Sequence, residues 1–391
     1  MTRPTTTGKA QDLITFTRST TGTYLGSDGL LKSAAINEAR IEYDASGNCL
    51  GLLVEEARTN AKQYSEVFTT EWSRGATTVT SNSTDTTAPD STNNATKIQV
   101  SGAAETRLRY TASFVQNVDY AFSVFAKAGT SSWLRLRNIG VGDGSSPTDA
   151  AWFNLSTGSL GTVASNLTPK IESVGNGWYR CSISGTVINP ALALIDVSVV
   201  SGNGFINNNT VGDNIYIYGA QLETGSFPTS YIPTNGSTVT RSADVASLAV
   251  SEFGYNQDQG SVVLEAVMPP SVISEQFWIL GSNTNSARWA FSNSTSPNVN
   301  AYDGASIFTV SSLQPSATQK MAIGTDQSTA IMCLDGVSGN QANTNGNISS
   351  LTTVFYFGGN NGGAPFLNGH IKSVQYYPLR LSNAQLQALT V

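Results

Sequence analysis

Charged residues are scarce in this chain of 391 residues. Asp, Glu, Lys and Arg make up 12% of the composition, roughly half of the usual share of about 25%. The formal net charge of −6 is spread without long runs, whereas nucleic acid and anionic lipid are bound by clustered Lys and Arg. The composition therefore argues against both partners, and solubility must rest on the abundant Ser, Thr, Asn and Gly.

Long apolar runs are also missing. No segment reaches the roughly 20 apolar residues that are needed to span a bilayer, so we expect no membrane insertion. The opening MTRPTTTGKAQ has no apolar stretch of the kind found in signal peptides. We therefore expect synthesis in a cytoplasm, although the polar surface is typical of proteins that work outside a cell.

Cysteine and histidine are too few to build most reactive centres. Cys49, Cys181 and Cys333 are odd in number and far apart, which fits neither a disulfide framework nor a CxxC metal site. The only histidine, His370, is predicted to be structural, and it is the only imidazole base for a Ser or Cys nucleophile. No zinc pattern or GxxxxGK loop is present, so we expect no cofactor.

Paired carboxylates, which glycoside hydrolysis requires, are missing from the expected strands. Glu265 stands alone in its strand, and the close pairs Glu38 with Glu42 and Glu55 with Glu56 lie in a small opening segment without an evident cleft. We therefore expect no enzyme and no catalytic residue. Only acidic residues converging from separate strands would revive a polysaccharide depolymerase.

The pattern that is present is that of strands and turns. β-Branched and aromatic runs at 120–126, 214–218, 261–267 and 353–357 are separated by Gly, Asn, Asp and Pro. Helical periodicity is clear only near the end, where Ser382 can cap a helix that places Leu386 and Leu389 on one face. The predicted fold class is all-β: two consecutive jelly-roll β-sandwiches preceded by a small N-terminal docking module.

Composition shifts divide the chain into three predicted domains. Residues 1–62 form an N-terminal arm and docking module, 63–235 a jelly roll of eight or so strands, and 236–391 a second sandwich closed by the helix. The stretch between Ser230 and Ala246 has few apolar residues and contains Pro233, Asn235 and Gly236, which is typical of a linker.

Three passages resemble bacteriophage structural proteins. Residues 16–24 (FTRSTTGTY) and 55–60 (EEARTN) look like the N-terminal module of phage tail-fibre and head-spike proteins. GNGWYRC at 175–181, YGAQLE at 218–223 and the following 228–244 resemble the jelly roll of the same proteins, which is similar to carbohydrate-binding modules. GHIKSVQYY at 369–377 with RLSNAQL at 380–386 looks like the end of a concanavalin A-like or laminin-G-like domain.

This resemblance implies a virion protein, made in the host cytoplasm, that serves as a fibre, spike or decoration subunit. The N-terminal module would dock on other virion proteins, and the subunit would form a homo-oligomer, expected to be a trimer. The sandwiches would attach to a cell-surface polysaccharide. Two alternatives stay open: a purely architectural virion subunit that binds no sugar, and a capsule-degrading depolymerase.

Sugar binding by sandwiches commonly uses aromatic rings beside side chains that pair with hydroxyls. In alternating strands such rings are also the usual core residues. The candidate glycan-binding residues are Trp133, Arg135 (with Arg137 beside it), Trp152, Trp289, Tyr302 and Asp303. Calcium is a further candidate ligand, through turns at Asp143–Gly144 and Asp213–Asn214, although turn formation alone explains both.

Overall fold

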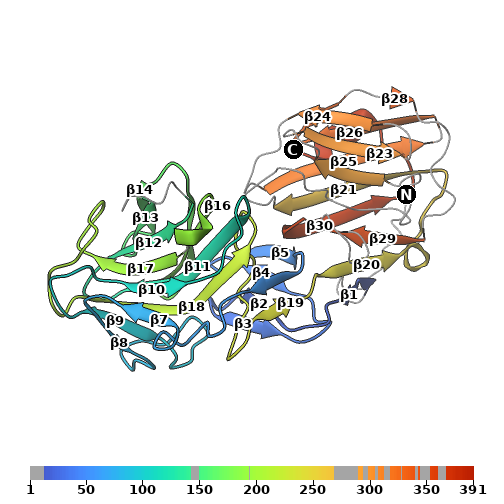
Figure 1. Ribbon diagram of the computed structural model, residues 1–391. Helices are drawn as coiled ribbons and strands as arrows, with labels where there is room; N and C mark the ends of the chain where they lie inside the picture. The colour runs from blue at the N-terminus through green and yellow to red at the C-terminus, as the bar shows by residue number, and fades with distance from the viewer. Residues whose placement is uncertain are drawn as a thin grey trace.

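Strands dominate the structure in both of its lobes (Figure 1). The computed structural model describes residues 13–141, 149–192, 194–267, 289–293, 298–303, 307–311, 318–326, 328–339, 342–343, 353–359 and 367–391. The predicted all-β, jelly-roll-like fold is confirmed. The division of the chain into three domains stays a prediction.

The first lobe is a sandwich of two antiparallel sheets. The first sheet runs β14 (Ser159–Val163), β13 (Ala150–Asn154), β12 (Trp133–Ile139), β17 (Leu194–Val200), β10 (Leu108–Thr111) and β7 (Trp72–Arg74). The second sheet runs β15 (Thr168–Gly175), β16 (Trp178–Thr186), β11 (Asp119–Ala128), β18 (Asn214–Thr224), β9 (Thr96–Val100) and β8 (Thr77–Thr80). Two six-stranded sheets thus replace the eight or so strands that the sequence predicted.

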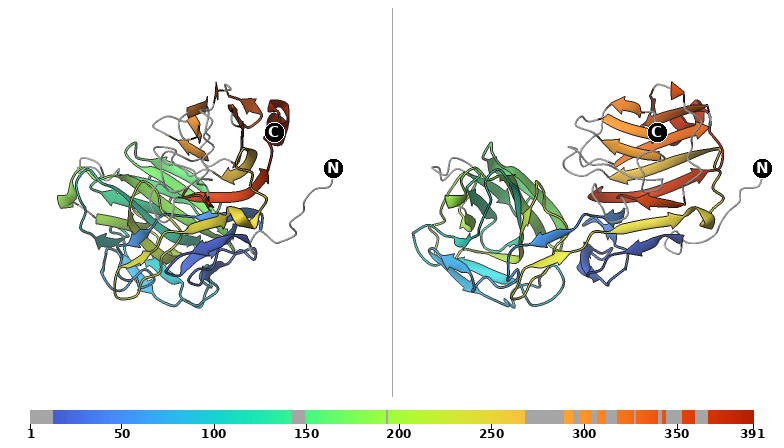
Figure 2. Two further views of the ribbon diagram at one scale, coloured as in Figure 1. Left: turned by 90° about the vertical axis from the view of Figure 1, so that its right-hand side faces the viewer. Right: turned by 45° about the vertical axis from the view of Figure 1, so that its right-hand side comes forward.

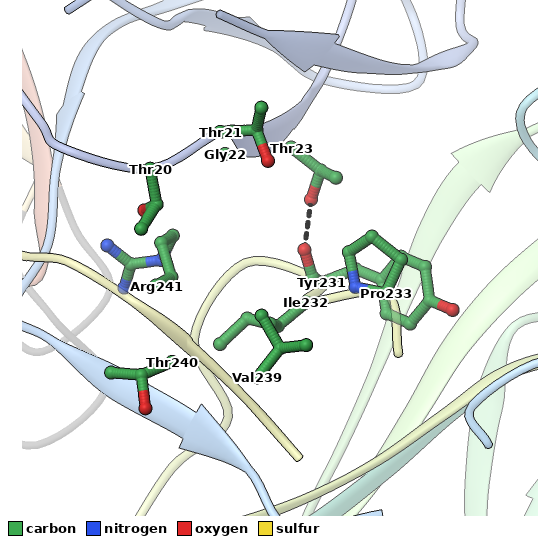
Figure 3. A pocket seen from close by; sticks show the side chains of 10 residues that line it. All are labelled: Thr20, Thr21, Gly22, Thr23, Tyr231, Ile232, Pro233, Val239, Thr240 and Arg241. Carbon is green, nitrogen blue, oxygen red and sulfur yellow. Dashed lines mark hydrogen bonds between the residues drawn. The ribbon is translucent and has the colours of Figure 1, made fainter. Parts of the chain in front are cut away.

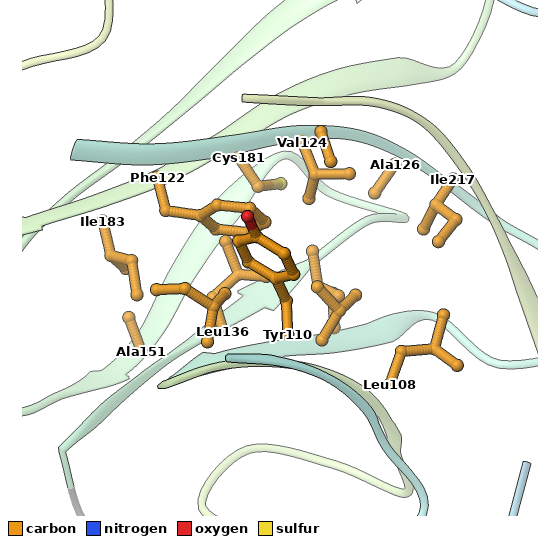
Figure 4. Close-up of a cluster of buried hydrophobic side chains, with 14 of the residues drawn as sticks. Leu108, Tyr110, Phe122, Val124, Ala126, Leu136, Ala151, Cys181, Ile183 and Ile217 are labelled. Carbon is orange, nitrogen blue, oxygen red and sulfur yellow. The ribbon is translucent and has the colours of Figure 1, made fainter. Parts of the chain in front are cut away.

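The core of this lobe lies between the two sheets. Alternate strand residues point inward, so Leu134 and Leu136 of β12 are buried while their neighbours face outward. Figure 4 shows Leu108, Leu136 and Ala151 of the first sheet opposite residues of the second, among them Phe122 and Ile183. The outward residues of the first sheet are therefore the ones available for another role.

The second lobe is built around a larger antiparallel sheet. Its order is β27 (Val337–Ser338), β26 (Thr329–Leu334), β25 (Thr318–Asp326), β21 (Gln259–Val267), β30 (Gly369–Tyr377), β5 (Cys49–Val54) and β4 (Ile41–Tyr43), and β28 (Ala342–Asn343) also pairs with β26. Two three-stranded sheets accompany it: β22 (Trp289–Asn293), β23 (Asn298–Asp303) and β24 (Ile307–Ser311), and β1 (Thr15–Thr17), β20 (Val245–Ala249) and β29 (Val354–Phe357).

Strands from the beginning of the chain pair with strands from its second half. β5 pairs with β30, β1 pairs with β20, and β6 (Arg58–Asn60) pairs with β19 (Val239–Arg241). Between them, β2 (Gly22–Leu25) and β3 (Leu31–Ala34) form a local hairpin. Phe16 and Val54 are buried in the core of the second lobe. The turned view in Figure 2 shows these strands at the waist between the lobes.

The stretch predicted to be a linker is exposed in its middle, at residues 235–240, and has buried residues on either side. Tyr231 and Ile232 are 2% and 3% exposed, and Arg241 and Asp244 are 1% and 0% exposed. The burial of Arg241 and Asp244 depends on ion-pair partners that are distant in the sequence, and the interpretation of this stretch as a linker between domains stays a prediction.

The predicted C-terminal helix is confirmed as α2 (Asn383–Leu389). Ser382 and Gln385 form a reciprocal capping box, and Leu386 is buried against the sheet. The described residues also include two short 3₁₀ helices, Pro190–Leu192 and Val250–Glu252. Within the part of the chain described here, no helix combines the length and apolar character that crossing a membrane requires.

Candidate functional site: an arginine cluster on the first sheet

Two rows of polar residues cross the outer face of the first sheet. In one row Trp152, Arg135 and Ser198 are paired across β13, β12 and β17. In the next row Arg137 and Arg109 flank Asp196 across β12, β17 and β10. Because paired residues of neighbouring strands project on the same face, these side chains gather over the middle of the sheet.

Two carboxylates each bridge two of the arginines. Asp196 accepts two hydrogen bonds from Arg109, at 2.7 Å from Nε and 2.8 Å from Nη2, and lies 3.5 Å from Nη1 of Arg137. Glu105 forms an ion pair with Arg107 and lies 3.9 Å from Nη1 of Arg135. The four guanidinium groups of Arg107, Arg109, Arg135 and Arg137, which we call the arginine cluster, are thus held in a fixed array.

Burial and neighbouring charges shift the pKa values of the arginine cluster. Asp149 acts on Arg137 in addition to Asp196. Burial, followed by the repulsion of Arg137, lowers the pKa of Arg135 to about 10. Burial, followed by the charge of Arg109, also lowers the pKa of Arg107, whereas its hydrogen bonds to Asp196 raise the pKa of Arg109.

Exposure within the arginine cluster falls from rim to centre. The side chains of Arg107 and Arg109 are 26% and 23% exposed, that of Arg137 is 12% exposed, and those of Arg135 and Asp196 are fully buried. The buried groups form a rigid floor, and the guanidinium groups at the rim can meet a ligand.

Three of the six residues predicted for glycan binding come together here. The Arg135 guanidinium lies 5.4 Å from the Trp152 ring centre, and the partly buried Trp133 packs beside Trp152 and Val200. Trp152 is only 3% exposed and its indole N–H donates to the Phe205 carbonyl at 2.7 Å. Its ring is therefore covered and packs against the Arg135 guanidinium, whereas Trp133 is only partly buried.

The other three candidates lie in the second lobe, apart from this cluster. Trp289 is in β22 and pairs with Asp303 of β23, and Tyr302 pairs with Ala290. Their side chains lie outside the described residues, so their assignment to a glycan site stays a prediction.

The calcium candidates that lie within the described residues form hydrogen bonds with neighbouring side chains. Asp143–Gly144 lies outside the described residues. Asp213 accepts from the Asn208 side chain at 2.9 Å, and Asn214 donates to Thr130 Oγ1 at 3.1 Å. Within the described segments, no group of three or more His, Cys, Asp or Glu side chains could hold a metal ion.

The acidic pairs noted in the sequence are engaged individually. Glu42 lies 2.6 Å from Nε2 of His370, which ties β4 to β30. Glu38 accepts from the Ala35 backbone at 2.7 Å, and Glu56 pairs with Arg58. Neither pair presents two carboxylates to a common substrate in this arrangement.

Glu55 belongs to a buried ion network at the waist. It lies 2.8 Å from Arg40 and 3.4 Å from Arg241, and Asp244 pairs with Arg18 at 3.1 Å and also with Arg40. Ser230 donates to Glu55 through its backbone N–H and its hydroxyl, at 2.7 Å and 2.6 Å. We call these residues the waist network, and all but Arg40 come from the passages that carry the resemblance to phage proteins.

A small cavity opens beside the waist network. It is lined by residues 20–23 on one side and by Tyr231, Ile232 and Val239 opposite, as Figure 3 shows. Its volume of about 40 Å³ holds roughly three water molecules. Thr23 closes one edge by donating to the Tyr231 carbonyl at 2.6 Å. Because of its small volume, the cavity cannot hold a sugar ring.

Sequence reasoning missed half of the arginine cluster. Arg107 and Arg109 flank Leu108, just as Arg135 and Arg137 flank Leu136. Two Arg-Leu-Arg triplets in strands put four cations on one face and two leucines in the core. The two triplets can be seen in the sequence. Their position on either side of β17, however, depends on the order of strands in the sheet, which the sequence does not show.

No family model matches the chain, and no curated protein matches it. Solved structures give weak likenesses. The CBM40 domain of the Ruminococcus gnavus IT-sialidase bound to α2,3-sialyllactose is 18% identical, covering 35% of this chain and 84% of that one, with a TM-score of 0.30.

Two further structures give similar values. Domain 4 of the Geobacillus stearothermophilus GH43 extracellular arabinanase AbnA, in complex with arabinotriose, is 16% identical over 38% of this chain and 73% of that one, with a TM-score of 0.31. Mouse laminin α1 domains LG4-5 are 10% identical over 83% and 89%, with a TM-score of 0.26. These TM-scores are too low to support an argument, so the assignment of an all-β fold depends on the sheets described above.

Proposed function

We propose that the protein is a structural subunit of a bacteriophage particle, a fibre, spike or decoration protein, that attaches to a glycan on the host surface. The observation that supports attachment is the arginine cluster, with the partly exposed Trp133 at its edge. Guanidinium groups in a rigid array donate well-directed hydrogen bonds to oxygens, and an aromatic ring beside them can cover the apolar face of a sugar.

The virion role is supported by sequence resemblance. Residues 16–24, 55–60 and 228–244 resemble phage tail-fibre and head-spike proteins, and these same passages supply Arg18, Glu55, Ser230, Arg241 and Asp244 of the waist network. Docking to other virion proteins through the N-terminal module, and a trimeric subunit, belong to the same proposal. Repeated weak sites on such an oligomer gain avidity on a surface.

The first test is binding of the full-length protein to a panel of bacterial strains before and after periodate oxidation of their surface sugars. The proposal predicts binding to some strains and its loss on oxidation. Binding that survives oxidation, or no binding to any strain, would contradict the attachment role. Immunogold labelling of particles from cells that carry the gene tests the virion role separately.

A purely architectural subunit is the second candidate, and exposed apolar residues favour it. Phe205 and Val211 are 61% and 65% exposed in the loop between β17 and β18. Contact with a neighbouring subunit would cover such residues. Virion labelling without any cell binding is the result that this alternative predicts.

A further inference from the structure

The waist network holds more positive than negative charge. Within the described residues its three arginines, Arg18, Arg40 and Arg241, share two carboxylates, Glu55 and Asp244. All five side chains are at most 7% exposed. A guanidinium does not lose its proton in a protein, and an uncompensated charge is costly to bury. A buried anion beside these groups would therefore stabilise the network.

The small cavity at the waist lies against all three arginines. Arg241 lines it directly. Gly22 is another lining residue, and a Cβ on Gly22 would lie 3.0 Å from Nε of Arg18 and 3.3 Å from Cδ of Arg40. The wall of the cavity at Gly22 is thus in contact with the other two arginines. A ligand in the cavity would meet a positive electrostatic environment.

Hydrogen-bond donors also face this cavity. Nη1 and Nη2 of Arg241 donate to the carbonyls of Ser242 and Glu56, at 3.1 Å and 2.7 Å, but its buried Nε has no acceptor among the described residues. The Thr20 hydroxyl accepts from the Ser242 backbone N–H at 3.0 Å, so it can donate its own hydrogen elsewhere. Figure 3 shows Thr20, Thr21 and Arg241 on one side of the cavity. Such a set of donors suits an anion.

We infer that the waist cavity binds a small inorganic anion of the size of chloride, held by the Arg241 guanidinium and by the hydroxyls of Thr20 and Thr21. The volume of about 40 Å³ admits such an ion together with a water molecule, but no larger organic anion. The bound ion offsets the excess charge of the waist network and so strengthens the joint between the opening segment and the rest of the chain. This inference is independent of the proposed glycan attachment.

The test is thermal unfolding of the full-length protein while gluconate, an anion too large for the cavity, is exchanged for chloride at constant sodium concentration. We expect the midpoint to rise by about 1–3 °C and then to saturate, because an ion that binds only the folded state stabilises it. Bromide should act like chloride. Broadening of the chloride NMR signal by the native protein measures the binding directly.

Variants of the lining assign the effect to this cavity. Arg241→Gln removes both the excess charge and the Nε donor, so its midpoint should not depend on chloride. Thr21→Val removes one hydroxyl from an exposed position, and the chloride concentration for half of the effect should rise roughly tenfold, as for the loss of one hydrogen bond to a charged group. Thr111→Val is the matched control: Thr111 is an exposed threonine in β10, outside the cavity, so its chloride response should equal that of wild type.

Two results would overturn the inference. Equal midpoints in chloride and gluconate, without broadening of the chloride signal, would show that the cavity holds water only. A chloride response that Thr21→Val retains as fully as Thr111→Val would place the ion elsewhere on the protein. The comparison of these two threonine variants decides the matter even if Arg241→Gln does not fold.

Discussion

Glu55 lies in the waist network with three arginines around one pair of carboxylates. Burial by itself disfavours its charged form, but Arg241, Arg40 and hydrogen bonds from Ser230 outweigh this and hold the pKa of Glu55 well below its ordinary value. The network therefore depends on every member. Removing one partner leaves an uncompensated buried charge, which costs more than the pair contributes.

We predict that Glu55→Gln lowers the free energy of unfolding by about 3–5 kcal/mol at pH 7, measured by urea denaturation. Glu56→Gln is the control: its side chain is 28% exposed and pairs with Arg58, so its loss should cost less than about 1 kcal/mol. Equal effects of the two substitutions would show that the waist network does not hold the lobes.

The same variant should respond to pH in a defined way. Because the folded pKa of Glu55 is depressed, its contribution is fully present above the ordinary value of 4.5 and is lost as the pH falls below it. The stability difference between wild type and Glu55→Gln should therefore narrow as the pH falls from 5 toward the acid limit. A constant difference across that range would contradict the depressed pKa.

At the scale of elements, the residue pattern of the sequence predicted those strands and the helix that depend on neighbouring residues alone. Alternating and aromatic runs marked β11, β18, β21 and β29, and a polar cap followed by spaced leucines marked α2. Pairing of β5 with β30 joins residues about three hundred positions apart, and no periodicity reports such a partner. The burial of Arg241 in β19, and of Asp244 after it, could not be predicted for the same reason, since their ion-pair partners are distant in the sequence.

Some residues of the candidate site could be predicted from the sequence, and others could not. Trp133, Arg135 and Trp152 were predicted because aromatic rings beside side chains that pair with hydroxyls are typical of sugar binding, and the structure gathers them on one face. Arg107 and Asp196 were missed, since only the order β12, β17, β10 brings them beside Arg135. The sequence of β13 likewise did not predict that the Trp152 side chain is buried.

Gly51 lets strand β5 approach its partner β30 closely. Its φ is +118°, a value that side chains with a Cβ rarely adopt, and a Cβ there would lie 2.3 Å from the Ile371 carbonyl oxygen. The β5 backbone can therefore approach β30 only with glycine at this position.

We predict that Gly51→Ala lowers the free energy of unfolding by about 1–3 kcal/mol or more, through backbone strain and the clash with β30, measured by thermal or urea unfolding. Gly254→Ala is the matched control, because a Cβ there meets no atom within 4 Å and its φ is not positive. A Gly51→Ala variant as stable as the control would refute the close approach.

At the scale of the whole molecule, the first lobe presents a charged face while the opening segment joins the two lobes. Strands before residue 62 complete the sheet of the second lobe, and the waist network anchors them to the end of the first lobe (Figure 2). Such a joint favours a stiff two-lobed subunit, in which a site on one lobe keeps a fixed orientation relative to the other.

The most direct test of the account is hydrogen–deuterium exchange of the full-length protein with and without a glycan that it binds. The proposed site predicts slower exchange on binding at 105–109, 133–137 and 150–154, with no change at 20–23 and 231–241 around the waist cavity. Slower exchange confined to the waist, or to the second lobe, would contradict a binding face on the first sheet.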